Sequence, residues 1–204
     1  TAAAIRRLTG RGVRTTDVTV LAFGKAAVPM THGALDAASV RGGVVIAPSL
    51  ELATHDLERH GLEVRAGGHP LPAADALETG DRVLALARSL GPDDVALCLI
   101  SGGGSAMLER PRDGVTLETL QRVTRALLAA GADITALNTV RRALSATKGG
   151  RLAAAIAPAR VVNVILSDVP GAPLDVVASG PTLPPPGGDA AAILRRHLGP
   201  DEAA

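Results

Sequence analysis

Aromatic side chains are almost absent from this 204-residue sequence, which has one Phe and neither Tyr nor Trp. Proteins that bind single-stranded nucleic acids stack bases on aromatic rings, and this chain offers no such platform. The formal net charge is only +1, so the chain also lacks the basic footprint of a duplex-binding protein. We therefore expect no nucleic-acid partner and a core built from Leu, Val, Ile and Ala.

The sequence also has little cysteine and no long hydrophobic run. Its single cysteine, Cys98, excludes a disulfide within the chain and favours a reducing compartment, so we expect a cytoplasmic protein. Cys98 lies inside an apolar segment and is expected in the core. No apolar run approaches the roughly 18 residues that a membrane-spanning helix needs, so no membrane partner is expected.

Apolar segments and helix-like segments alternate along most of the chain. The apolar segments predict strands over residues 17–23, 43–47, 62–65, 95–100 and 161–166. Helix formers and apolar spacing predict helices over residues 1–10, 26–39, 73–90, 117–130, 134–145 and 189–198. This alternation is typical of an α/β fold, and we predict a three-layer, mostly parallel, Rossmann-like sheet with helices on both faces. Residues 1–204 are expected to form a single α/β domain.

The stretch from Val95 to Leu108 joins a buried strand to a glycine-rich loop. The loop places three consecutive glycines between two serines: Ser101, Gly102, Gly103, Gly104 and Ser105. Glycines tolerate positive φ angles, which can gather backbone N–H groups into a concave nest that suits an anion. A helix that begins near Ser105 would add its positive dipole end, and the two hydroxyl groups could contact phosphate oxygens. The alternative is a flexible glycine turn.

Lysine is scarce, because Lys25 and Lys148 stand beside nineteen arginines. In a chain with so strong a preference for arginine, a retained lysine indicates a need for a compact and flexible ammonium group. Lys25 directly follows a predicted strand and could stabilise charge on a transferred phosphoryl group; the alternative is a surface charge at a helix start. Lys148 is a candidate for substrate or phosphate binding, and equally for a helix-terminal cation before Gly149.

Two further polar residues follow predicted strands. Ligands of parallel sheets bind beyond the carboxyl ends of the strands, which makes His69 and Asp168 candidates. Asp168 could hold a metal ion or accept a proton from a substrate hydroxyl, or it could cap the following turn. His69 precedes a proline that favours an extended backbone, so its ring could point into the cleft and bind substrate. An ordinary solvated histidine is the alternative.

One predicted helix carries Asn138, Arg141 and Arg142. An arginine that faces the glycine loop could bind a substrate carboxylate or phosphate in bidentate fashion, whereas ordinary helix-surface arginines are the alternative. Two standard nucleotide motifs are missing. The sequence has no Walker-type loop, and Met107 occupies the last position of the G-x-G-x-x-G dinucleotide fingerprint, so both of those site types are disfavoured.

Five sequence blocks occur in order along the chain. They are GKAA at 24–27, GGHPLP at 67–72, SGGGSAM at 101–107, LNTVRRALSATKGGRLA at 137–153 and LSDVPGAPLDVVASGPT at 166–182. Together they resemble the N-terminal domain of the class II glycerate 2-kinase family, whose relatives include proteins labelled hydroxypyruvate reductase in tartrate-utilisation operons. Five blocks in sequence are more specific than any single glycine loop.

The resemblance implies ATP-dependent phosphorylation of D-glycerate to 2-phosphoglycerate, with ATP and Mg²⁺ as cofactors. It implies a cleft between this domain and a second one, with Lys25 and Asp168 as catalytic residues and the Ser101 to Ser105 loop binding substrate or phosphate. On this hypothesis Asp168, also the candidate metal ligand, orients or deprotonates the 2-hydroxyl group of glycerate. Lys25 and Mg²⁺ then neutralise charge on the transferred phosphoryl group.

Two departures from the family qualify this expectation. Ala172 stands where the family usually has Asp, and Asp175 is a candidate substitute. The sequence ends at Ala204, so we expect the chain to correspond to the N-terminal domain and the C-terminal domain to be absent. A non-catalytic module that binds phosphate or a hydroxy acid is therefore an alternative, and a hydroxypyruvate reductase is a weaker one. The sequence leaves the oligomeric state open, a homo-oligomer included.

Overall fold

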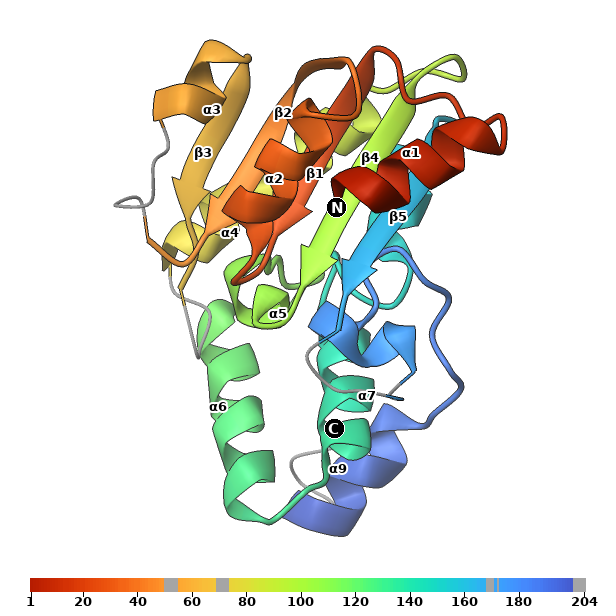
Figure 1. Ribbon diagram of the computed structural model, residues 1–204. Coiled ribbons are helices and arrows are strands. Elements are labelled where there is room, and N and C mark those ends of the chain that lie inside the picture. Colours follow the sequence, from red (N-terminus) through yellow and green to blue (C-terminus); the bar gives the residue numbers. More distant parts are fainter. Residues whose placement is uncertain (50–54, 69–73, 168–170, 172, 200–204) are drawn as a thin grey trace.

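Within the described residues, the sheet has five strands that all run in the same direction (Figure 1). The computed structural model describes residues 1–49, 55–68, 74–167, 171 and 173–199. The strands are β1 (Val18–Phe23), β2 (Val40–Ala47), β3 (Leu62–Ala66), β4 (Val95–Ser101) and β5 (Arg160–Leu166). Their order is β3-β2-β1-β4-β5, so the parallel sheet expected from the sequence is confirmed.

Helices cover both faces of the sheet (Figure 1). One face packs against α1 (Ala2–Gly10), α2 (Ala27–Leu35) and α3 (His55–Arg59). The opposite face packs against α4 (Ala74–Arg88) and α8 (Arg151–Ile156). The predicted three-layer arrangement is therefore confirmed. None of the described helices combines the length and the apolar character needed to cross a bilayer.

The central strands β1 and β4 are buried along their whole length, whereas the edge strand β5 ends in Leu166, which is 52% exposed. A strand between two helical layers needs apolar side chains on both faces, which explains the continuous apolar runs in the sequence. Cys98 lies in β4 with no exposed surface, and burial raises the pKa of its thiol to about 12. Its expected place in the core is confirmed.

A further group of helices lies beyond the carboxyl ends of the strands (Figure 1). They are α5 (Gly104–Met107), α6 (Leu117–Ala129), α7 (Ile134–Leu144), the 3₁₀ helix η1 (Leu174–Ser179) and α9 (Ala190–Leu198). A separate small core joins α6, α7 and α9. The sequence located these three helices to within one residue at each end. It missed α3 and η1, because elements of five or six residues are too short to show a helical periodicity.

The strand order reverses between β1 and β4, because the chain leaves β1 for α2 on one face and reaches β4 from α4 on the other. Such a switch point is where open α/β sheets bind ligands. The Lys25 N–H donates to the Gly102 carbonyl at 2.9 Å, and the Ala26 N–H donates to Ser101 Oγ at 3.0 Å. Gly24 has a φ of +116°, and a Cβ there would collide with Ser101. This close approach of the two loops therefore requires glycine.

Candidate functional site

A cavity of about 160 Å³ lies beyond the carboxyl ends of β4 and β5. Its walls come from the glycine loop after β4, from α7, from the residue that follows β5 and from η1. The glycines and polar side chains that line it are Gly102, Gly103, Ser105, Asn138, Arg141, Ser167 and Ser179. The fold thus brings together the glycine loop and α7, both of which were singled out from the sequence.

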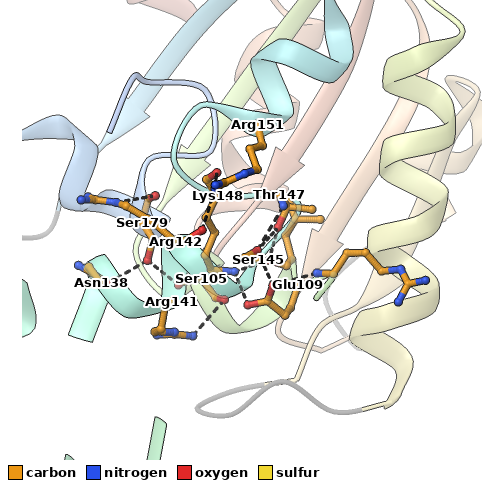
Figure 2. Close-up of polar contacts among 12 residues, drawn as sticks. Ser105, Glu109, Asn138, Arg141, Arg142, Ser145, Thr147, Lys148, Arg151 and Ser179 are labelled. Atoms are coloured by element: carbon orange, nitrogen blue, oxygen red, sulfur yellow. Dashed lines mark hydrogen bonds and ion pairs between the residues drawn. The ribbon is translucent and has the colours of Figure 1, made fainter. Parts of the chain in front are cut away.

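Arg141 reaches the cavity from α7 (Figure 2). Its Nη2 donates a hydrogen bond to the Ser105 backbone carbonyl at 3.2 Å, which holds the guanidinium against the glycine loop. Its Nε is buried without a hydrogen-bond partner among the described residues. Burial lowers the pKa of Arg141, while the negative charge of Glu109 acts in the opposite direction. A buried cationic donor is costly unless something satisfies it, so this part of the cavity fits an anion.

Three side chains form a hydrogen-bonded chain along the cavity wall (Figure 2). Ser179 Oγ donates to Asn138 Oδ1 at 2.9 Å, and Ser105 Oγ lies 2.9 Å from Ser179 Oγ. Asn138 and Ser179 are buried, whereas Ser105 is partly exposed. Asn138 and Ser105 were candidates from the sequence. Ser179 was not, because a lone serine in a glycine- and proline-rich loop carries no distinctive signal.

The segment that carries Ser179 has an unusual backbone. Ala178 and Ser179 have φ angles of +51° and +62°, in the left-handed region that non-glycine residues avoid. Arg142 holds this conformation, because its Nε donates to the Ser179 carbonyl at 3.2 Å. Its Nη2 donates to both the carbonyl and the carboxylate of Asp175, at 2.7 and 2.8 Å. Arg142 and Asp175 therefore brace the cavity wall.

The glycine loop is not a uniform nest. Of its three glycines only Gly103 has a positive φ, of +80°. Gly104 is buried, and a Cβ there would press against Phe23 of β1 and Ala178 of η1, so close packing favours glycine at this position. The Ser101 hydroxyl accepts the Ala26 N–H and does not line the cavity. The expected helix begins at Gly104 but is a single turn, so it adds little dipole.

The two lysines occupy opposite environments. Lys25 follows β1 and has an exposed side chain, which is not part of the cavity lining. Lys148 is 1% exposed and places Nζ 2.6 Å from Glu109 Oε2 and 3.1 Å from the Leu108 carbonyl oxygen (Figure 2). Burial lowers the pKa of Lys148, while the adjacent carboxylate acts against that change. The Lys148 ammonium group therefore faces a buried carboxylate instead of the cavity.

Glu109 is a residue that the sequence did not single out. It is fully buried and accepts hydrogen bonds from Lys148 and, at 2.5 Å, from Ser145 Oγ. In the sequence it stands next to Arg110, in a pattern typical of an ordinary surface position. Its partners lie 36 and 39 residues further along the chain, so only the fold shows that this carboxylate belongs to the interior.

His69 and Asp168 lie outside the described residues, as does Ala172. Ser167, which directly precedes Asp168, lines the cavity. In the described part of the chain, no group of three or more His, Cys, Asp or Glu side chains is arranged to hold a metal ion. The roles of His69 and Asp168 therefore stay predictions.

A protein family described as "Domain of unknown function (DUF4147)" matches residues 3–202. The chain belongs to this family. The DUF4147 chain is 43% identical over 169 residues to D-glycerate 2-kinase of Thermotoga maritima, a match that covers 82% of this chain and 40% of the relative. It is 42% identical over 187 residues to a putative hydroxypyruvate reductase of Agrobacterium vitis, with 87% of this chain and 41% of the relative covered.

Solved structures agree with the observed fold. The DUF4147 chain matches the crystal structure of glycerate kinase from Thermotoga maritima with a TM-score of 0.82 and 38% identity. The match covers 96% of this chain and 48% of that chain. The resemblance to glycerate kinases expected from the five sequence blocks is confirmed. The chain spans less than half the length of these relatives.

Proposed function

We propose that this chain takes part in the ATP-dependent phosphorylation of D-glycerate to 2-phosphoglycerate. The observation that carries the proposal is Arg141, which lines a cavity at the carboxyl edge of the sheet and whose Nε is a buried donor with no partner among the described residues. Glycerate has one carboxylate, which suits this donor, and two hydroxyl groups, which suit the neighbouring serines. Relatives named D-glycerate 2-kinase and glycerate kinase support the same substrate.

The size of the cavity favours a small acid over a nucleotide. Pockets for drug-sized molecules measure about 300–1,000 Å³. This cavity measures about 160 Å³, which suits a ligand of a few heavy atoms. On this proposal glycerate occupies the cavity, and ATP lies outside it with its phosphates directed toward Lys25.

Lys25 and Asp168 complete the proposed chemistry. Lys25 is exposed beside the glycine loop, where its ammonium group can offset charge on the transferred phosphoryl group. Asp168 follows Ser167 of the cavity wall and would orient or deprotonate the 2-hydroxyl group. When bound, Mg²⁺ would neutralise charge on the ATP phosphates, and Asp168 is the candidate ligand for it.

The proposal extends to the partners of the chain. The matched part covers less than half of these relatives, which favours a second domain in the intact enzyme. That domain would face this edge of the sheet and exclude water during phosphoryl transfer. His69 remains a candidate substrate ligand. A reducing cytoplasm suits the single buried Cys98.

Two measurements on the purified chain test the proposal. The first follows ADP release with D-glycerate, ATP and Mg²⁺, and identifies the product with enolase, which consumes 2-phosphoglycerate. The second measures D-glycerate binding by calorimetry. Turnover that yields 2-phosphoglycerate supports the kinase, whereas binding without turnover favours the non-catalytic module. Oxidation of NADPH with hydroxypyruvate would instead favour the activity in the name of the Agrobacterium vitis relative.

A further inference from the structure

The hydrogen-bonded chain in the cavity wall, hereafter the Asn138–Ser179–Ser105 relay, has a fixed direction. A serine hydroxyl carries one proton. Ser179 donates its proton to Asn138 Oδ1, so its oxygen can only accept a hydrogen bond from Ser105, 2.9 Å away. The Ser105 hydroxyl proton is therefore donated to Ser179 Oγ and is not available to a ligand. Because Ser105 lines the cavity, its hydroxyl oxygen is left to accept a hydrogen bond from a ligand there.

The relay is held from outside the cavity. Ser179 is fully buried in the left-handed region, and its carbonyl accepts hydrogen bonds from Arg142 Nε and from the Gly149 N–H, both at 3.2 Å. Asn138 is 4% exposed on α7. The order of the relay follows from its first hydrogen bond, in which Asn138 presents Oδ1, an acceptor, to Ser179 Oγ.

Arg141 supplies the complementary group. Its guanidinium contacts the Ser105 backbone carbonyl, and its Nε has no partner among the described residues. Arg141 and Ser105 both line the same small cavity. One is a cationic donor and the other an acceptor. A ligand that satisfies both needs an anionic group and, beside it, a hydroxyl group that can donate.

We propose that the Asn138–Ser179–Ser105 relay makes the cavity selective for hydroxycarboxylates, with the carboxylate on Arg141 and a ligand hydroxyl, the 3-hydroxyl group in D-glycerate, donating to Ser105 Oγ. The 2-hydroxyl group then stays free for the role proposed for Asp168. An anion that offers only acceptor atoms meets lone pairs at Ser105 and loses that contact. Ser105 is thus a substrate-binding residue, and Ser179 and Asn138 are positioning residues that act through it. The inference rests on the proposed function in that D-glycerate is such a ligand.

Calorimetric titration of the full chain with three probes tests the relay. The probes are D-glycerate, D-lactate, which keeps the carboxylate and the 2-hydroxyl but lacks the 3-hydroxyl, and sulfate, which offers only acceptors. We expect D-glycerate to bind about fivefold more tightly than D-lactate, which corresponds to one hydrogen bond. Ser105→Ala should reduce that ratio to about one, and Ser105→Thr should retain it. Ser89→Ala removes a hydroxyl that donates to the Leu86 carbonyl at the end of α4, and this control should leave the ratio unchanged.

Ser179→Ala distinguishes the relay from a merely structural role. The variant frees the Ser105 proton, so sulfate binding should strengthen relative to D-glycerate binding, whereas general loosening of the site would weaken both by the same factor. The relay is overturned if Ser105→Ala weakens sulfate more than D-glycerate, or if D-glycerate binds and no variant changes the ratios. In the latter case the proposed function stands. If the unaltered chain binds no carboxylate at all, the proposed function itself fails.

Discussion

The two lysines show how differently one residue type can be used in the same chain. Lys148 is buried among hydrogen bonds to Glu109 and to the Leu108 carbonyl, whereas Lys25 extends into solvent where β1 ends. At Lys148 the space inside the interior disfavours the wider arginine side chain, which the chain otherwise prefers. At Lys25 the proposed contact with a transferred phosphoryl group would favour a mobile point charge.

Of the two lysines, Lys148 is the one that holds elements of the structure together. The Glu109–Lys148 ion pair joins the segment after α5 to the turn after α7, where the Ala146 N–H also donates to the Arg110 carbonyl at 2.6 Å. Because α7 carries Arg141, this buried pair fixes one wall of the cavity without lining it. The Lys25 side chain is exposed, so we expect it to contribute little to stability.

The largest effect is expected from breaking the buried pair. Glu109→Gln leaves the Lys148 charge uncompensated in the interior, so the free energy of unfolding should fall by about 3–5 kcal/mol. Urea denaturation measures this loss. The double variant Glu109→Leu with Lys148→Met replaces both charges with apolar groups and should recover most of the stability. A loss below about 1 kcal/mol in the single variant would show that the Glu109–Lys148 pair contributes little to the stability of the fold.

Removing the other lysine should spare stability and damage turnover. On the proposed function, Lys25→Ala loses a charge that acts on the transferred phosphoryl group, and kcat should fall about 100- to 1,000-fold. Its free energy of unfolding should stay within about 0.5 kcal/mol, because the side chain is exposed. Arg125→Ala, an exposed cation on α6, is the matched control and should change neither quantity. A nearly unchanged rate would remove Lys25 from the mechanism.

The sequence predicted the sheet well because its signals are local. The buried strands β1 and β4 and the glycine loop can each be recognised from a few consecutive residues. The start of β2 was misplaced by three residues, because the expected strand covered only the compact apolar run of residues 43–47. In the structure β2 begins at Val40, and a Cβ on Gly43 would collide with the Val20 carbonyl, so the glycine serves strand packing.

The site was predicted only in part because its remaining contacts are long-range. Ser105 and Arg141 could be named from a loop motif and a helix face. Ser179 becomes meaningful only through Ser105, 74 residues away, and Glu109 only through Lys148. A sequence pattern does not show whether a charge is buried, which is why Lys148 was equally well interpreted as a ligand and as a helix-terminal cation.

Replacing each lysine by arginine compares the packing at the two sites without a change of charge. Lys148→Arg forces a wider, planar group into a filled interior and should lower the free energy of unfolding by about 1–3 kcal/mol. Lys25→Arg should change it by less than about 0.5 kcal/mol. Thermal or urea unfolding of the two variants side by side provides the measurement. Equal losses at both sites would mean that the Lys148 environment is not tightly packed.

Glu63 forms two ion pairs at the surface, with Arg65 and with Arg82, and we expect them to contribute much less stability than the buried pair. Burial raises the pKa of Glu63, but hydrogen bonds from Arg65 and Arg82 outweigh this effect and hold the pKa below its usual value. A lowered carboxylate pKa stabilises the fold above the pKa of the unfolded chain, and the benefit disappears as the pH falls through the native pKa. Glu63→Gln should therefore cost at most about 1 kcal/mol at neutral pH.

Urea unfolding of this variant and the unaltered chain, repeated at falling pH, measures the difference. The difference in the free energy of unfolding should shrink toward zero in acid, where Glu63 is protonated. It should also shrink in high salt, because the ion pairs of Glu63 are partly exposed and are screened by ions. A difference that persisted unchanged in acid would mean that Glu63 acts through packing rather than charge. The Glu109→Gln loss should survive high salt, because ions in solution do not reach a pair that is 0% and 1% exposed.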